Sequence, residues 1–183
     1  MFPLKDNIPT DRPAIITIAF IAINVLVYFV LQKGGIFSGP DDGIVVRWGA
    51  IPYEFAHPGK ECAIAAGQIV CEGMPGVVGE APSQPPFWVT ALSSMFMHGS
   101  ILHLGGNMLF LWIFGNNVED AMGHVRYVAF YLLGGLVAVA AQVLVEPDAA
   151  VPTIGASGAV AAVLGGYILL YPRARVVTLI FIV

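Results

Sequence analysis

The chain has 183 residues, of which 57% are hydrophobic and 11% are charged, with a formal net charge of -4; its mean hydropathy is +0.81. Because soluble domains carry about 25% charged residues, this composition excludes an ordinary soluble domain and favours a membrane protein with several spans. The small negative charge, without a basic run, disfavours nucleic-acid binding. We therefore expect one all-α membrane domain over residues 1–183, a polytopic bundle of helices in the lipid bilayer.

The first apolar segment, residues 13–31, has the length that a membrane-spanning helix needs, about 20 residues. Pro13 follows Asp11, an arrangement typical of a helix start. No small-residue cleavage site follows at the right distance. The segment is therefore predicted to be an uncleaved span and not a signal peptide.

A long polar loop rich in Gly and Pro follows at residues 32–86. It is longer than an ordinary connection, so we expect it to be partly structured. Its two cysteines, Cys62 and Cys71, do not have the spacing of zinc ligands. A disulfide between them suits a loop in an oxidising compartment, and two unrelated thiols fit the sequence equally well.

Three further apolar segments predict spans at residues 87–115, 127–145 and 153–171. Residues 176–183 are apolar again and are interpreted as the start of a fifth span. Eight residues cannot cross a bilayer at about 1.5 Å per residue. The sequence thus predicts about four complete spans plus the start of a fifth, in a domain that is incomplete at its C-terminus.

The positive charges predict the orientation of these spans, because Lys and Arg in short loops favour the cytoplasmic side. The short loop at residues 146–152 contains no Lys or Arg. This predicts a multi-pass protein of the cell (inner) membrane with a cytoplasmic N-terminus and residues 32–86 outside. The charges of the inner side are Lys5, Arg12, Arg126, Arg173 and Arg175, and those of the long loop are Lys33, Arg47 and Lys60.

Three polar residues stand at a similar predicted depth in the membrane. His103 and Asn107 are four residues apart and share a helix face, and Ser157 begins a later span that runs in the same direction. Counting helical rise places all three about 10 Å below the outer surface. Polar groups at such depth are costly and mark functional sites. This set suits acyl transfer, in which Ser157 attacks a carbonyl and the other two, with a backbone N–H, stabilise the oxyanion.

Structural interpretations of the same residues stay open at this point. Small residues four apart have a spacing common in tight helix packing, and Asn107 is compatible with a bond between helices. The two stripes of small residues are Ser157, Ala161 and Gly165, and Gly158, Ala162 and Gly166. His98 and His103 are five residues apart, on different faces of one helix, so we expect no metal site.

Other titratable residues of the loops are expected to be structural or solvated. Glu119 and Asp120 lie in a predicted cytoplasmic turn, where they are solvated or capping. His57 and His124 lie in loops and are assigned no role.

At these residues the sequence resembles the rhomboid family of intramembrane serine proteases. "GASGA", residues 155–159, resembles the family's serine motif, with Ser157 between Gly155 and Gly158. "HGSILHLGGN" resembles its second-helix pattern, with His98 as the outer histidine. "GNNVEDAMG" resembles the family's turn into the third helix, and its residues four apart are Gly115, Glu119 and Gly123.

The resemblance implies a rhomboid-like fold, Ser157 as the nucleophile, and His103 and Asn107 as oxyanion donors. It implies no metal and no organic cofactor. It also implies that the substrates are membrane proteins with a single transmembrane helix, cut near its outer end. The sequence does not predict an oligomeric state.

In the family, the general base is a histidine of the sixth helix, and none of the four histidines here follows Ser157. The chain by itself is therefore expected to lack the base and to have little activity. The alternatives are a non-catalytic rhomboid-like protein that binds transmembrane clients and a small transporter piece. The presence of Ser157, His103 and Asn107 together favours the protease.

The predicted orientation can be tested with single cysteines at Ser38 and Ala174 in a background without Cys62 and Cys71. An impermeant thiol reagent added outside intact cells should label the cysteine at position 38 and not the one at 174, because the Lys and Arg distribution places them on opposite sides. Equal labelling of the two positions would contradict the orientation.

Overall fold

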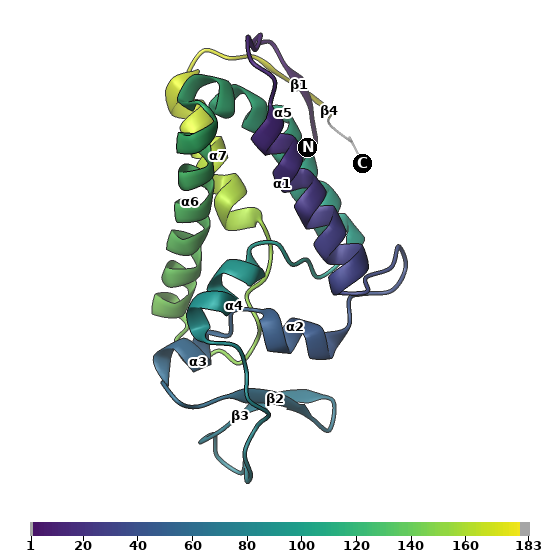
Figure 1. Cartoon of the computed structure of the whole chain (residues 1–183), viewed down its shortest axis with the longest axis vertical. Helices are drawn as coiled ribbons and strands as arrows, with labels where there is room; N and C mark the ends of the chain where they lie inside the picture. The colour runs from purple at the N-terminus through teal and green to yellow at the C-terminus, as the bar shows by residue number, and fades with distance from the viewer. Residues whose placement is uncertain (1, 180–183) are drawn as a thin grey trace.

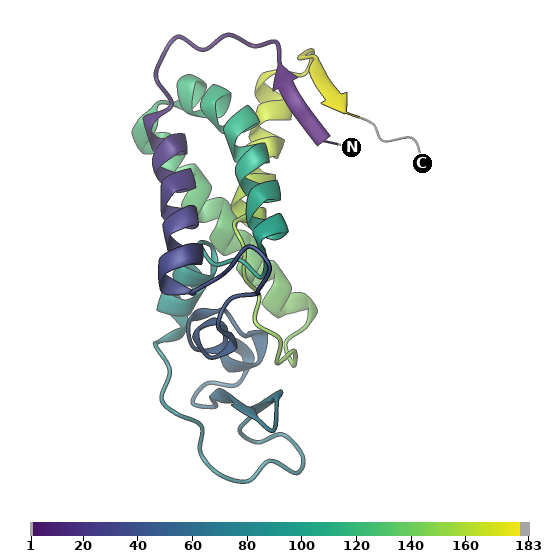
Figure 2. The same cartoon turned by 90° about the vertical axis from the view of Figure 1, so that its right-hand side faces the viewer.

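Four helices, α1 (Ile15–Leu26), α5 (Ile101–Met122), α6 (His124–Val145) and α7 (Ser157–Leu170), form a bundle in the computed structural model, which describes residues 2–179 (Figure 1). Helix α7 packs against α5 and α6, and α1 packs against α5. Shorter helices and a hairpin lie at one end of this bundle, and a two-stranded ribbon lies at the other, as both views show (Figures 1 and 2). The chain is mostly helical, as the sequence predicts.

The lengths of these helices bear on the predicted spans. Among the described helices, α6 alone is both long and apolar enough to cross a membrane. Helix α1 continues into the π-helical turn η1 (Val27–Leu31), and the combined apolar helix Ile15–Leu31 is shorter than a full span, as is α7 with 14 residues. Four spans therefore remain a prediction.

The predicted span at residues 87–115 is divided into α4 (Phe87–Ser94) and α5 in the structure. The polar "HGS" interrupts the helix, and Ser100 caps α5 because its Oγ accepts the backbone N–H of His103 at 3.1 Å. Helix α5 then continues beyond residue 115 and ends at Met122, and the next residue is Gly123, whose φ of 77° favours glycine.

Small residues bring α6 and α7 close together. A Cβ atom at Gly134 would collide with Ala162, and one at Gly158 would collide with Ala138. The small-residue packing considered for α7 is therefore real, but it uses the face of Gly158. Ser157 lies on a different face of the helix and is exposed.

The loop at residues 32–86 is partly structured, as predicted. Helices α2 (Asp42–Trp48) and α3 (Pro52–Ala56) are followed by an antiparallel hairpin of β2 (Cys62–Ala65) and β3 (Gln68–Cys71). We call these four elements the cap. Cys62 and Cys71 face each other across the hairpin and form a disulfide. Both are buried in a small apolar cluster with Val46, Ile51 and Tyr53.

A second short ribbon pairs β1 (Phe2–Asp6) with β4 (Val176–Leu179), antiparallel. The prediction that a fifth span begins at residue 176 is wrong for residues 176–179, and residues 180–183 lie outside the described part. Val176, Val177 and Thr178 are β-branched, which favours a strand where a partner is available. The ribbon is tied to the bundle because Asp6 Oδ2 accepts hydrogen bonds from Asn117 Nδ2 at 2.6 Å and Tyr167 Oη at 2.8 Å.

Glu119 ties α1 to the α5–α6 turn. Its side chain is 1% exposed, and its two oxygens accept the backbone N–H groups of Ile16 at 2.9 Å and Thr17 at 2.8 Å, together with Thr17 Oγ1 at 2.7 Å. His124 Nδ1 lies 2.6 Å from the same carboxylate. Glu119 is thus not solvated: it caps the first turn of another helix, and His124, which the sequence left without a role, takes part.

Gly115 allows α1 and α6 to lie close to α5. A Cβ atom there would lie 2.7 Å from Tyr127 Oη and 3.0 Å from Thr17 Cγ2. A side chain at this position would separate α1 from α5, and the Glu119 hydrogen bonds would lengthen.

Replacing Glu119 with Gln should lower the free energy of unfolding by about 3 kcal/mol. The amide has one oxygen that accepts hydrogen bonds, and its NH₂ group would face a buried N–H or O–H donor. Denaturation in detergent, followed by circular dichroism, measures this change. The neighbouring Asp120→Asn is the matched control, since Asp120 accepts exposed N–H groups, those of Asp11 and Arg12, and it should cost less than about 1 kcal/mol. Equal losses for the two variants would refute the special role of Glu119.

Candidate active site

Ser157 is the first residue of α7, and Ala156 before it already has helical backbone angles, with φ −70° and ψ −4°. Thr153 pairs with Ala50 in an antiparallel bridge, and the backbone N–H of Gly155 donates to Ser94 O at 2.9 Å. These bonds hold the segment before α7 from two sides. The hydroxyl of Ser157 stands at the N-terminal end of α7, where the backbone N–H groups have no partner within the helix.

Gly155 brings His103 and Ser157 together. It has a φ of +130°, and a Cβ atom built on it would lie 2.8 Å from both Cε1 and Nε2 of His103 and 3.6 Å from Ser157 Oγ. The imidazole and the hydroxyl therefore stand near the same point above the glycine. Only glycine fits here, because other residues rarely adopt this φ and because the ring of His103 occupies the place of a Cβ atom.

The hydrogen bonds of His103 define what its ring can do. Nδ1 accepts the backbone N–H of Gly99 at 3.4 Å. In a neutral imidazole, an acceptor at Nδ1 places the proton on Nε2. The nitrogen near Gly155 is therefore a donor, which suits the stabilisation of a negative oxygen better than the abstraction of a proton.

Asn107 lies one turn further along α5 and is nearly buried. Its Nδ2 donates to the backbone oxygen of His103 at 3.1 Å. A carboxamide carries two N–H donors, so one remains for another partner. The three residues that the sequence placed at one depth thus come from the N-terminal ends of two packed helices, α5 and α7.

His98 lies beside His103, contrary to the prediction that the two occupy different faces of one helix. Helix α5 begins only at Ile101, so His98 belongs to the preceding loop, and the two ring centroids are 5.0 Å apart at an angle of 69°. The ring of His98 is fully buried, and neither nitrogen has a hydrogen-bond partner within residues 2–179.

Gln32 is a residue of this region that the sequence analysis missed. Its Nε2 donates to His98 O at 3.1 Å, and its Oε1 accepts the His98 N–H at 2.8 Å. The buried amide thus ties the end of η1 to the loop that carries His98. A single polar residue at the end of a long apolar run was the available signal.

Other polar clusters lie elsewhere. His57 stacks on Tyr53 in the cap, with ring centroids 4.1 Å apart, and its Nε2 is 3.5 Å from Asp148 Oδ1. No group of three or more metal-ligating side chains gathers within the described part of the chain.

The Rhomboid domain family model matches residues 85–183. Rhomboid protein 1, mitochondrial, of Saccharomyces cerevisiae is 32% identical over 97 residues, which are 51% of this chain and 28% of the yeast protein. The presenilin-associated rhomboid-like protein, mitochondrial, of Mus musculus is 34% identical over 86 residues, 46% of this chain and 23% of its own length. Rhomboid protease GluP of Bacillus subtilis is 30% identical over 149 residues, 81% of this chain and 23% of its own.

The chain therefore belongs to the rhomboid family. The family that its sequence motifs resemble is thus confirmed. It covers less than a third of the length of each of these curated relatives. No solved structure matches it.

The role of Gly155 in this geometry can be tested by stability. Gly155→Ala should lower the free energy of unfolding by about 2 kcal/mol. Alanine has an unfavourable backbone conformation at this φ, and its Cβ would force the ring of His103 to move. Gly165→Ala, inside α7, is the control, since a Cβ there meets nothing within 4 Å, and it should leave stability unchanged or raise it by up to about 1 kcal/mol. Equal free energies of unfolding for the two variants would contradict this role of Gly155.

Proposed function

We propose that this protein is an intramembrane serine endopeptidase that cleaves single-span membrane proteins near the outer end of their transmembrane helix. The observation that carries the proposal is the shared position of Ser157 Oγ and the His103 ring over Gly155. Membership of the rhomboid family supports it, as does the similarity to a relative named as a rhomboid protease.

In the proposed reaction, Ser157 Oγ attacks the carbonyl carbon of the scissile peptide bond. The hydroxyl proton passes to a general base and then to the leaving amine, and an acyl-enzyme remains. Water then attacks this ester and regenerates the serine. The exposure of Ser157 supports this step, because water must reach the hydroxyl.

The negative charge on the substrate oxygen would be stabilised by converging donors. Nε2–H of His103, the second N–H of Asn107 and a backbone N–H of the first turn of α7 are the groups that fit this task. The positive end of the α7 dipole adds to their effect.

The general base is not assigned to any of the four histidines of the chain. His103 presents a donor to this region, and His98 is buried behind it. His57 lies in the cap and His124 beside Glu119. The family resemblance assigns this role to a histidine of a sixth helix, which forms a dyad with the serine.

The expected setting is a cell membrane, with a cytoplasmic N-terminus and the cap outside, where the site would open toward the outer surface. Its substrates would be transmembrane proteins in the same bilayer. The similar proteins of mitochondria and of a bacterium support a membrane location without specifying which membrane.

The proposal predicts a graded loss of activity in the protein expressed from its native gene. Ser157→Ala should abolish cleavage of a single-span substrate in liposomes, because no other group replaces the nucleophile. Asn107→Ala and His103→Ala should each reduce cleavage by about 10²–10³-fold, because the remaining oxyanion donors continue to act.

Three results would change this interpretation. Full activity of Ser157→Ala would refute the serine-protease proposal. A loss in His103→Ala as complete as in Ser157→Ala would assign His103 as the base and not as an oxyanion donor. Absence of cleavage in the unmodified protein, with retained binding of transmembrane segments, would favour the non-catalytic alternative.

A further inference from the structure

The cap touches the segment that leads to Ser157. Ala50 lies between α2 and α3, and it exchanges two backbone hydrogen bonds with Thr153, at 2.7 and 3.3 Å. The neighbouring Gly49 also lies against this segment, because a Cβ atom there would lie 2.9 Å from Pro152 Cβ and 3.0 Å from Ile154 Cγ2. We call residues 152–155 the serine segment, and one of its two sides is therefore formed by the cap.

A second contact joins the cap to the same connection. The backbone N–H of Tyr53, in α3, donates to Ala149 O at 3.1 Å. On the far side, Gly155 is bonded to Ser94 and approached by His103. The position of Ser157 thus depends on two walls, the α4–α5 region and the cap.

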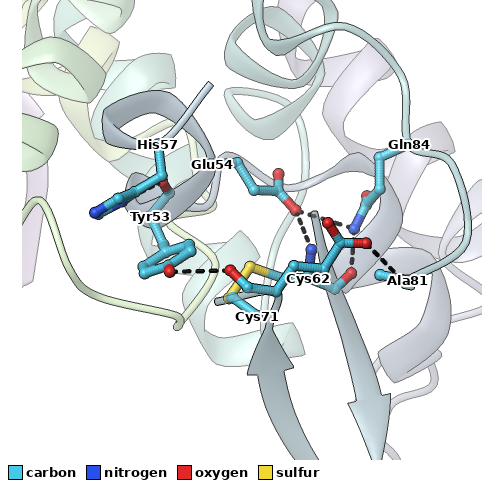
Figure 3. Close-up of a disulfide and its surroundings, with 8 residues drawn as sticks. Tyr53, Glu54, His57, Cys62, Cys71, Ala81 and Gln84 are labelled. Atoms are coloured by element: carbon cyan, nitrogen blue, oxygen red, sulfur yellow. Dashed lines mark hydrogen bonds between the residues drawn. A yellow bond between two sulfur atoms is a disulfide. The ribbon is translucent and has the colours of Figure 1, made fainter. Parts of the chain in front are cut away.

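A disulfide and side-chain hydrogen bonds, among them that of Tyr53 Oη to Glu72 O at 3.0 Å, help to hold the cap together (Figure 3). Its strands have four residues each, and isolated two-stranded hairpins are marginal in stability. Cys62 and Cys71 belong to the same buried apolar cluster as Ile51 and Tyr53. Glu54 adds to this, since its Oε1 accepts the N–H of Cys62 at 2.9 Å and Gln84 Nε2 at 3.1 Å.

We propose that the Cys62–Cys71 disulfide fixes the cap as a positioning element for the serine segment, so that the protease reaches full activity only after this bond has formed. This inference rests on the proposed function of Ser157. The route of coupling runs from the disulfide to Ile51 and Tyr53, then to Ala50, and from there to Thr153.

The step is a thiol–disulfide exchange with a protein or small-molecule disulfide as oxidant. The S–H bonds of Cys62 and Cys71 break and one S–S bond forms between them. The oxidant's S–S bond takes up the two electrons and two protons and becomes a dithiol. Because both sulfurs are buried, the bond is expected to form while the cap folds and to persist afterwards.

The test uses the protein expressed from its native gene, with Cys62→Ser/Cys71→Ser compared against the unmodified protein. We expect kcat to fall at least tenfold with a smaller change in KM, because the serine segment loses one wall while substrate binding in the membrane remains. Hydrogen exchange at Thr153 should accelerate, and exchange in α6 should not. Ala65→Ser, at the exposed hairpin tip, is the matched control and should retain full activity.

A second pair of variants tests the contact itself with the disulfide intact. Gly49→Ala should lower kcat and accelerate exchange at Thr153, because its Cβ would press on Pro152 and Ile154, as well as on the backbone oxygen of Val45 at 2.6 Å. Gly39→Ala should do neither, since its Cβ would meet nothing closer than the backbone oxygen of Gly99 at 3.9 Å. In the unmodified protein, reduction by a dithiol during mild unfolding should remove activity, and reoxidation with oxidised glutathione should restore it.

The outcomes separate this inference from the proposed function. Unchanged kcat and unchanged exchange at Thr153 in Cys62→Ser/Cys71→Ser would overturn the inference, while inactivity of Ser157→Ala in the same assay would leave the protease intact. An accelerated exchange across the whole protein, α6 included, would show a general loss of stability and would also overturn it. Activity of Ser157→Ala would refute the proposed function, whatever the cysteine variants do.

Discussion

A buried carboxylate at the end of α5 is the interaction on which the bundle depends. Backbone N–H groups without a partner are costly in an apolar environment, and the first turn of a helix always has them. Glu119 accepts two of these groups from α1 and also contacts His124 at the start of α6. One side chain thus fixes three helices at a common level. The position of α5 follows from this, and α5 carries His103 and Asn107 at its opposite end.

The candidate site is held by main-chain contacts as much as by side-chain packing. Gln32 fixes the backbone of His98, Ser100 caps α5, and Gly99 donates to the ring of His103. Ser157 is held by the bonds of the segment before it. A nucleophile and its oxyanion donors need positions that do not change during reaction, and such contacts hold them before a substrate arrives.

The sequence predicted the bundle, because apolar segments indicate helices, and it placed Ser157 at the depth of His103 by counting helical rise from the polar ends of two spans. It did not predict the pairing of Ala50 with Thr153 or the role of Gln32. These contacts join residues far apart in the chain, and a glutamine at the end of an apolar run has the same pattern whether it meets water or a buried backbone. The wrong assignment of His98 to the helix of His103 has a similar cause, since one capping serine decided where that helix begins.

Glu54 gives the cap a dependence on acidity. Burial raises the pKa of its carboxyl to about 7, with nearby Glu61 adding to the rise and the N–H of Cys62 opposing it. Between the ordinary pKa of 4.5 and about 7, the folded cap holds a proton that the unfolded chain would release. The stability of the cap therefore decreases as the pH rises through this window and is greatest below it. In mildly acidic surroundings the carboxyl is neutral, and the cap that lies beside the serine segment is then most stable.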